Sequence, residues 1–230
     1  MSHSKTILIM RPEPGASFLQ KKLQKTIHNV IYFPVTQIVS CPIVLPEEKI
    51  GSYNSLLVTS SNGLRFLSKK DISLLQHLSV YCVGKKTHAI AKERGFLFVR
   101  SYNSVTHLLE SFPFGENFHS LYLAGCVRRK LLEETFSKKQ ALLDILEVYD
   151  TILTEKAQRN QEALLFDIVF LTSVFNAKWL NSQISFLPKT MRIFCISERI
   201  KQALSLDLQK FATVSPVEEE KELFSLLWDE

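Results

Sequence analysis

Short apolar runs of strand length recur along this chain, and several are followed by spaced apolar residues that suit a helix. One such unit has an apolar run at 56–58, the hydroxyl-rich turn Thr59-Ser60-Ser61, and a spaced pattern at 64–67. A second has an apolar run at 168–171, and its turn and spaced pattern occupy 172–180. Each pattern predicts a strand, a turn and a helix in that order.

The two units are related by a single offset of 113 residues, which places Ser60 on Ser173 and Gly84 on Ser197. Two strand-turn-helix units that match at one offset indicate an internal duplication. Strands that alternate with helices at this rhythm predict parallel sheets covered by helices on both faces. We therefore interpret the chain as a duplicated α/β module.

The remaining elements follow the same rhythm. Further strands are expected at 6–10, 30–33, 35–40, 79–84, 97–99, 120–124, 145–153, 192–196 and 212–214. Helices are expected from Gly15, Lys85, Ser104, Leu131 and Ser215-Pro216, and around Ala203-Leu204. The alternating pattern at 35–40 is typical of an edge strand.

Composition places the chain among folded, membrane-free proteins. Its 230 residues are 46% hydrophobic with 16 Phe, and no apolar run reaches the roughly 18 residues of a membrane span. The N-terminus lacks a secretory pattern, and the four cysteines form no CxxC pair. Cys82 and Cys195 lie in predicted strands and are expected to be buried, inert thiols. We expect a reduced, cytoplasmic protein, and the net charge of +5 favours anionic partners.

Candidate binding residues gather at the predicted carboxyl ends of the strands, where parallel sheets bind ligands. Hydroxyls, glycines, cations and helix N-termini dominate there, and these groups receive anions. The candidates are Arg11, Ser60, Ser61, Asn62, Thr87, Gly125, Arg128, Ser173 and Ser197. Simpler interpretations stay open: Ser60-Ser61 as a helix cap, Gly84 as a turn glycine, Arg128 as a surface charge, and Tyr149 as a half-buried structural phenol.

Several familiar site motifs are absent. The chain has no GxGxxG, GxxxxGK[ST], GxSxG or HExxH sequence, and its six histidines are dispersed. We therefore expect no metal and no cofactor.

Four motifs together resemble the uroporphyrinogen-III synthase family. They are Arg11-Pro12-Glu13-Pro14-Gly15-Ala16, Leu57-Val58-Thr59-Ser60-Ser61-Asn62-Gly63-Leu64-Arg65, Val83-Gly84-Lys85-Lys86-Thr87-His88-Ala89 and Val148-Tyr149-Asp150-Thr151. The resemblance runs from Ile7 to the C-terminal segment. It implies an enzyme that closes the linear tetrapyrrole hydroxymethylbilane and inverts its D ring, without a cofactor.

The resemblance also implies an architecture that simple duplication does not. Two similar parallel-sheet α/β domains of flavodoxin-like fold are joined by a pair of linker strands, and one domain is built from both ends of the chain. Carried over, the linkers are about 35–41 and 147–154. The outer domain is then 1–38 with 150–230, and the inner domain is 39–149.

The site residues implied by the resemblance lie mainly in the inner domain. Tyr149, in the VYxT stretch, is the implied acid that aids departure of the hydroxyl, and Thr87 is an implied substrate contact. The second half departs from the family pattern, because Ile200 replaces a hydroxyl, Glu198 adds a carboxylate and Phe175 replaces a smaller side chain. We therefore expect the contacts of the inner domain to match the family more closely than those of the outer domain.

The expected partner is hydroxymethylbilane, whose eight carboxylates fit the basic charge, and the protein is expected to be a monomer. The alternative is a non-catalytic two-domain binder of a small anion or of nucleic acid. Lysines are not interleaved with aromatics in one stripe, so we expect no nucleic-acid partner.

Overall fold

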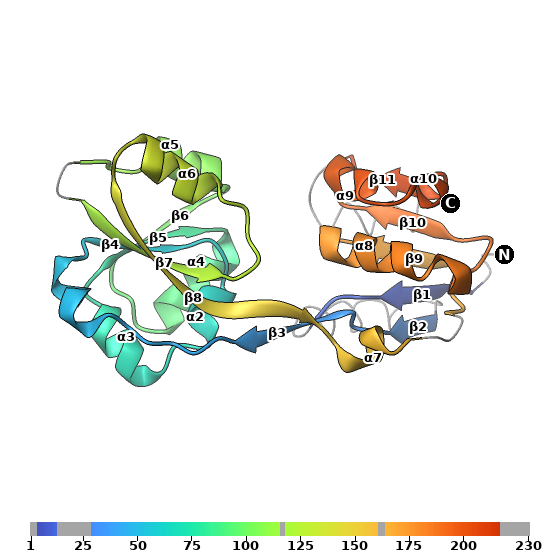
Figure 1. The fold of residues 1–230 in the computed structure, drawn as a ribbon, viewed down its shortest axis with the longest axis horizontal. Helices are drawn as coiled ribbons and strands as arrows, with labels where there is room; N and C mark the ends of the chain where they lie inside the picture. Colours follow the sequence, from blue (N-terminus) through green and yellow to red (C-terminus); the bar gives the residue numbers. More distant parts are fainter. Residues whose placement is uncertain (1–3, 13–28, 116–117, 161–163, 217–230) are drawn as a thin grey trace. The chain divides into compact units, whose positions relative to one another are not determined.

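The structure is a computed structural model that describes residues 4–12, 29–115, 118–160 and 164–216. The chain divides into two compact units, and each contains strands and helices (Figure 1). Unit 1 comprises Met1–Gln37 and Ile152–Glu230, and unit 2 comprises Ile38–Thr151. The helices expected after Gly15 and beyond Pro216 lie outside the described residues.

Unit 1 contains a five-stranded sheet in the order β11-β10-β9-β1-β2, and its pairs are all parallel. Its strands are β1 (Thr6–Ile9), β2 (Asn29–Tyr32), β9 (Ile168–Leu171), β10 (Arg192–Cys195) and β11 (Ala212–Val214). Numbered along the chain within the unit, the order is 2-1-3-4-5 read from the β2 edge. This is the flavodoxin-like order.

The sheet that contains the strands of unit 2 has six strands in the order β3-β8-β7-β4-β5-β6. Its strands are β3 (Thr36–Ser40), β4 (Ser55–Val58), β5 (Ser79–Val83), β6 (Val99–Tyr102), β7 (His119–Gly125) and β8 (Leu142–Leu153). The pairs β4–β5, β4–β7, β5–β6 and β7–β8 are parallel. β3 occupies the edge, which confirms the prediction from its alternating pattern.

The two sheets share one order, and this confirms the duplicated, parallel α/β fold. β1, β2, β9, β10 and β11 match β7, β8, β4, β5 and β6, and the first residue of each strand lies 113 residues from that of its counterpart. Read in this correspondence, both sheets have the order 2-1-3-4-5. The second copy therefore begins with β7, whereas its spatial neighbour β4 comes earlier in the chain.

Helices and short 3-10 turns connect the strands. They are η1 (Glu47–Ser52), α2 (Asn62–Arg65), α3 (Lys69–Leu75), α4 (Lys85–Glu93), α5 (Val105–Glu110), α6 (Leu131–Lys138), α7 (Glu155–Gln158), α8 (Val174–Ser182), η2 (Ile184–Phe186), α9 (Glu198–Gln202) and α10 (Leu206–Gln209). The Ser104 hydroxyl accepts a hydrogen bond from the His107 amide, which confirms the predicted cap of α5. The strand predicted at 97–99 is wrong in position, because β6 begins at Val99.

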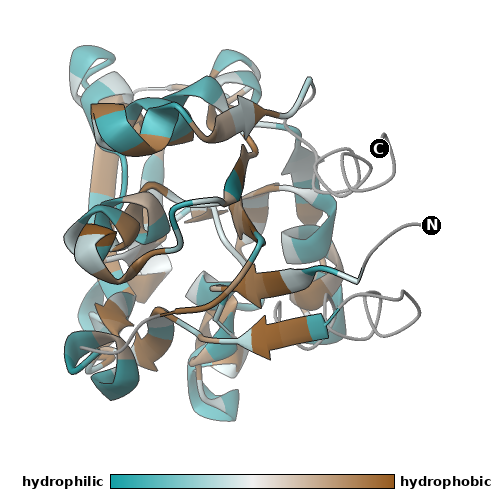
Figure 2. Ribbon diagram, turned by 90° about the vertical axis from the view of Figure 1, so that its right-hand side faces the viewer, coloured by the Kyte–Doolittle hydropathy of each residue, from teal (hydrophilic) through white to brown (hydrophobic). Residues whose placement is uncertain are grey.

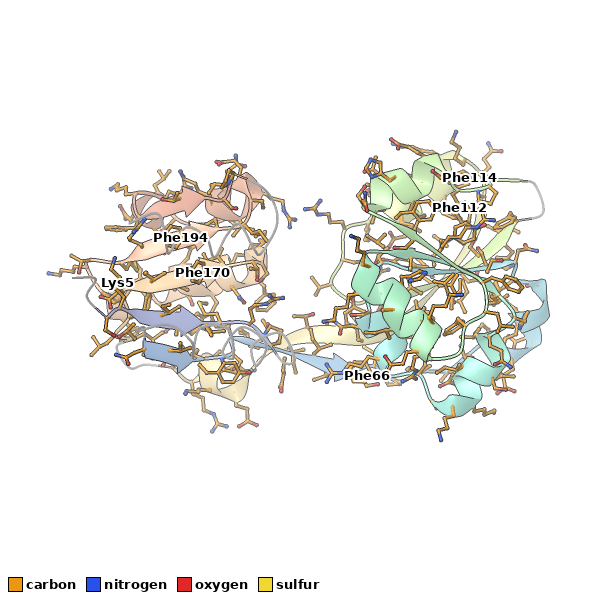
Figure 3. The ribbon with its side chains drawn as sticks, turned by 180° about the vertical axis from the view of Figure 1, so that it is seen from behind. Lys5, Phe66, Phe112, Phe114, Phe170 and Phe194 are labelled. Atoms are coloured by element: carbon orange, nitrogen blue, oxygen red, sulfur yellow. The ribbon has the colours of Figure 1, made fainter. Side chains whose placement is uncertain are left out.

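Both faces of the sheet in unit 2 are covered. Alternate strand residues such as Leu56 and Val58 pack against α2, α3 and α4, while Leu57 packs on the other face against α5 and α6. On that second face the rings of Phe112 and Phe114 lie with centroids 5.0 Å apart (Figure 3). The strands are mostly apolar and the helices carry polar outer surfaces (Figure 2), as two-sided burial requires.

Unit 1 has its larger apolar cluster on the face covered by α7, α8 and α9, around Trp179 and Ile200. The opposite face carries Phe170 and Phe194, whose ring centroids lie 5.4 Å apart (Figure 3). Cys195 and its counterpart Cys82 are fully buried, as predicted.

At the amino edge of the sheet in unit 2, the carboxylate of Asp144 joins three elements. It accepts hydrogen bonds from the Tyr53 hydroxyl (2.7 Å) and the Lys49 ammonium (3.4 Å), and it lies 3.4 Å from the His119 ring. The hydrogen bond from Tyr53 is the largest cause that lowers the pKa of Asp144. This carboxylate therefore favours the folded state when it is ionised.

Asp144→Asn is expected to lower the thermal midpoint of unfolding in a pH-dependent way. The pKa of Asp144 is lower in the folded state than in the unfolded state, where it is about 3.9, so its stabilising effect is complete above about pH 5 and is lost as the pH falls below about 4. Circular dichroism melts from pH 3 to 7 should show the gap between wild type and variant closing at low pH. Asp207→Asn, whose carboxylate is 73% exposed, is the matched control with little effect. A gap that is independent of pH would contradict the stabilising role of the ionised Asp144 carboxylate.

A phenol and a hydroxyl turn at the switch point of unit 2

In unit 2 the chain order of the sheet reverses between β4 and β7, which is where α/β sheets of this kind bind ligands. The carboxyl end of β4 leads into Thr59 and Ser60, and β7 ends at Gly125. The structure therefore brings together, on one edge of one unit, two turns that lie more than 60 residues apart in the sequence.

Tyr149 lies directly over Gly125. A bulge between β7 and β8 shifts the register, so that Ala124 pairs with Glu147 but Gly125 pairs with Tyr149. A Cβ atom added to Gly125 would lie 2.7 Å from Cζ and 2.9 Å from the hydroxyl oxygen of the Tyr149 ring. Only glycine permits this approach, because real Cβ atoms do not come so close to another atom.

Burial raises the pKa of the half-buried Tyr149. The side chain of Ser60 acts on the hydroxyl of Tyr149 and lowers its pKa, as does the positive charge of Arg128. A phenol with a raised pKa stays protonated at neutral pH, so Tyr149 can donate a proton or a hydrogen bond.

A second phenol, that of Tyr122, contacts the hydroxyl turn. The hydroxyl of the buried Tyr122 lies 2.8 Å from Oγ1 of Thr59. Burial is the largest cause that raises the pKa of Tyr122. The sequence analysis missed Tyr122, because it stands inside an apolar strand run where a core position was expected.

Arg128 is held by protein acceptors rather than standing as a surface charge. Its Nε atom lies 2.6 Å from Glu133, and its Nη1 atom lies 2.7 Å from Glu147 and 2.8 Å from the carbonyl oxygen of Gly125. Its side chain is only 14% exposed. The guanidinium therefore fixes the turn that carries Gly125, and its hydrogen bond is the largest cause that lowers the pKa of Glu147.

Arg128→Met is expected to lower the free energy of unfolding by about 3 kcal/mol, because it leaves the mostly buried Glu133 without its cationic partner. The second oxygen of Glu133 already lacks a hydrogen-bond partner within the described part of the chain. Urea unfolding measures the change. Arg159→Met is the control for an exposed pair, and Arg128→Met combined with Glu133→Met should recover stability. Equal losses in Arg128→Met and Arg159→Met would contradict this role.

The other predicted residues of unit 2 also follow the carboxyl ends of its strands. Ser61 is the N-cap of α2 but makes no side-chain cap bond, whereas the Ser60 hydroxyl accepts a hydrogen bond from the Asn62 amide at 3.3 Å. Gly84 has a φ of 85°, which confirms its interpretation as a turn glycine. Thr87 is only 4% exposed, so its role as a substrate contact stays a prediction.

Arg11, Ser173 and Ser197 belong to unit 1, at the ends of its strands. The Ser173 hydroxyl accepts a hydrogen bond from the Asn176 amide and so caps α8. Ser197 is the N-cap of α9, with no side-chain cap bond, and is 7% exposed. Ile200 occupies the position that Thr87 has in unit 2, and it packs in the core of unit 1. The structure thus assigns the predicted binding residues to two groups, one on each unit.

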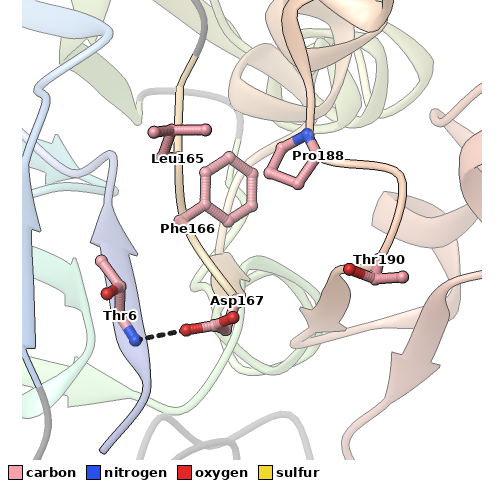
Figure 4. A pocket seen from close by; sticks show the side chains of 6 residues that line it. All are labelled: Thr6, Leu165, Phe166, Asp167, Pro188 and Thr190. Carbon is pink, nitrogen blue, oxygen red and sulfur yellow. Dashed lines mark hydrogen bonds between the residues drawn. The ribbon is translucent and has the colours of Figure 1, made fainter.

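A cavity of about 230 Å³ in unit 1 lies at the amino ends of its strands, beside the starts of β1 and β9 (Figure 4). The predicted binding residues of unit 1 lie at the other, carboxyl ends. In the cavity the Thr6 amide donates to Oδ2 of Asp167 at 2.7 Å. None of its lining residues was predicted as a site residue. Within the described ranges, no group of three His, Cys, Asp or Glu side chains is placed to hold a metal ion, and no helix is long and apolar enough to cross a membrane.

Comparisons with known proteins agree on one family. The family model described as uroporphyrinogen-III synthase HemD matches residues 17–225. The crystal structure of uroporphyrinogen-III synthetase from Helicobacter pylori is 12% identical, with a TM-score of 0.66 over 99% of each chain. A mutant uroporphyrinogen III synthase from the extremely thermophilic bacterium Thermus thermophilus is 14% identical, with a TM-score of 0.61 over 98% of this chain and 97% of that one.

Because these two structures share so little sequence identity with the chain, they support its fold alone. A comparison with curated protein sequences finds no match. Nothing in the matches supports a non-catalytic binder of a small anion or nucleic acid. The family model covers most of the chain, and the chain belongs to the uroporphyrinogen-III synthase family.

Proposed function

We propose that this protein converts hydroxymethylbilane to uroporphyrinogen III and water, with inversion of ring D, and so acts as a cyclising lyase of haem biosynthesis. The observation that carries the proposal is the protonated phenol of Tyr149, which lies over Gly125 and is influenced by Ser60 at the switch point of unit 2. Membership of the family supplies the reaction, and this geometry supplies a candidate acid.

The first step needs a proton on the departing hydroxyl group of hydroxymethylbilane. In the proposed mechanism Tyr149 donates its phenolic proton, the carbon–oxygen bond breaks, and water leaves. The pyrrole electrons then stabilise the remaining cation, which closes on ring D through a spiro intermediate, and the proton that the closed ring loses restores the phenol. Ser60 and the charge of Arg128 favour the phenolate that the transfer leaves behind, since both oppose the effect of burial on the pKa of Tyr149.

The substrate's carboxylates need several cations and amide donors. In unit 2 the exposed Lys85 and Lys86 open α4 directly after β5, next to β4. Free amides at a helix N-terminus and nearby ammonium groups both favour anions. We propose these groups as contacts in unit 2, together with Ser61, Asn62 and Thr87. Arg11, Ser173 and Ser197 are the proposed contacts on unit 1.

The proposal extends to the organisation of the protein. We propose that the two units act as domains, 1–38 with 150–230 and 39–149, and that strands 35–41 and 147–154 link them. We further propose a cytoplasmic monomer that works without a metal or other cofactor. A single chain would then supply all of the groups that the reaction uses.

Product analysis tests the proposed function. Purified protein, with metals chelated, is mixed with freshly made hydroxymethylbilane, and the porphyrin isomers are separated after oxidation. The proposal predicts the type III isomer, whereas spontaneous closure gives type I. Type I alone, together with nucleic-acid binding whose affinity falls steeply with salt, would favour the binding alternative instead.

A further inference from the structure

Two thiols that lie 85 residues apart in the sequence nearly touch in unit 2. Sγ of Cys41 lies 3.2 Å from Sγ of Cys126, and both residues are half-buried. Cys41 follows directly after β3, and Cys126 follows directly after β7. The other two cysteines, Cys82 and Cys195, are fully buried and belong to the cores.

The pair stands on either side of β8, beside the candidate acid. The Cys41 amide donates to the carbonyl oxygen of Val148 at 3.2 Å, and the Cys126 amide donates to that of Tyr149 at 2.9 Å. Cys126 also follows Gly125, over which the Tyr149 ring lies. A change in the position of Cys126 therefore reaches Tyr149 through both the backbone hydrogen bond and the glycine contact.

The surroundings oppose ionisation of the Cys126 thiol. Burial is the largest cause that raises the pKa of Cys126 to about 12, followed by the hydrogen bond with Cys41 and the carboxylate of Asp150. Cys126 therefore stays protonated at neutral pH. Cys41 is then the thiol that attacks first, because Cys126 is held in the less reactive protonated form.

We propose that Cys41 and Cys126 form an oxidisable dithiol site, which a small disulfide converts to an intramolecular disulfide across β8. The sulfur atoms need to approach by about 1 Å to reach the ordinary S–S length of about 2.05 Å. In the proposed reaction, side-chain rotation and a shift of the turn at Cys126 supply this movement.

The reaction proceeds by two thiol–disulfide exchanges. The Cys41 thiolate attacks one sulfur of the small disulfide, whose S–S bond breaks and releases one small thiol. The Cys126 sulfur then attacks the Cys41 sulfur, loses its proton, and displaces the second small thiol. The two protein thiols are oxidised by two electrons, and the small disulfide is reduced by two electrons and takes up two protons.

The effect on turnover rests on the proposed function, whereas the modification does not. Closing the disulfide pulls on the turn that holds Gly125 and changes the position of the Tyr149 ring. Because a displacement of about 1 Å near reacting groups can cost on the order of 100-fold in rate, we expect the oxidised protein to turn over about tenfold to a hundredfold more slowly. Reduction with dithiothreitol should restore the rate.

The test uses the full-length reduced protein and oxidised glutathione. Intact mass and peptide mapping should show the loss of two hydrogen atoms and a single linked pair, Cys41 with Cys126, while Cys82 and Cys195 stay reduced. Cys126→Ser should instead retain a glutathione adduct on Cys41. Unreacted thiols in the folded protein, a different linked pair, or stable adducts on the wild type would each overturn the site.

Activity separates this inference from the proposed function. Cys41→Ser should match the reduced wild type in turnover and keep that turnover in oxidised glutathione. If the reduced wild type makes no type III isomer, the proposed function fails. Peptide mapping still shows whether Cys41 and Cys126 form a disulfide. A mapped disulfide that leaves turnover unchanged would overturn its coupling to Tyr149.

Discussion

Tyr149→Phe is expected to lower the rate of formation of the type III isomer by about a hundredfold, within a general range of tenfold to a thousandfold for loss of an acid or a hydrogen-bond donor. The substitution keeps the ring over Gly125 and removes only the hydroxyl, whose pKa Ser60 lowers. An interaction used mainly in the transition state affects turnover rather than affinity. Single-turnover rates and substrate affinity, measured on the same protein, separate the two effects.

Tyr122→Phe is the matched control for Tyr149→Phe. Tyr122 is buried, and its hydroxyl also lies beside the hydroxyl turn, at 2.8 Å from Thr59, but it is proposed to have no contact with substrate. Loss of this hydrogen bond should cost about 1 kcal/mol of stability and change the rate much less than Tyr149→Phe does. Full activity in Tyr149→Phe would remove Tyr149 as the acid.

Gly125→Ala is expected to reduce turnover by about a hundredfold through displacement of the Tyr149 ring. The added methyl group would lie 2.7 Å from Cζ of that ring, so the ring or the turn must shift. A shift of about 1 Å is enough for this loss, and the overpacked site should also lose about 1–3 kcal/mol of stability. Steady-state kinetics and urea unfolding measure both effects.

Gly115→Ala is the control for the loss of a glycine, because a Cβ atom there meets nothing within 4 Å. It should leave rate and stability close to wild type. If the two changes act through the same hydroxyl, Gly125→Ala should slow Tyr149→Phe little further, since coupled sites are not additive. Independent, multiplicative losses in the double variant would contradict the shared mechanism.

The fold could largely be predicted from the sequence, because the signal is a repeated one. The offset that places Ser60 on Ser173 also relates all five pairs of equivalent strands. Boundaries were less secure: β8 begins at Leu142 rather than Ile145, and β6 at Val99 rather than Leu97. Strand ends depend on hydrogen bonds to neighbours, which apolar periodicity does not report.

The contacts of the site could be predicted only in part. The closeness of Gly125 and Tyr149 depends on a bulge that shifts the register by one residue, and no local pattern marks that bulge. The partners of Arg128 include Glu147, which comes from a different strand, so the sequence could not decide between a binding residue and a surface charge. Pairing across a sheet decides such contacts, and the sequence alone does not fix the register.

The duplication explains one departure that the sequence left open. Ile200 stands where a hydroxyl was expected, and its counterpart in unit 2 is Thr87. Both positions are buried, with 2% and 4% exposure, so an apolar side chain fits the core of unit 1 without loss of packing. The buried helix position therefore accounts for an apolar residue at Ile200, while the role of Thr87 toward substrate stays a prediction.

The most direct measurement is the ratio of type III to type I isomer as the concentration of protein is raised against a fixed amount of hydroxymethylbilane. Spontaneous closure competes with the catalysed reaction, so the account predicts that type III rises toward the whole product as protein increases. Tyr149→Phe should need about a hundredfold more protein for the same ratio, while Tyr122→Phe follows the wild-type curve. A wild-type product that stays type I at every protein concentration would contradict the account.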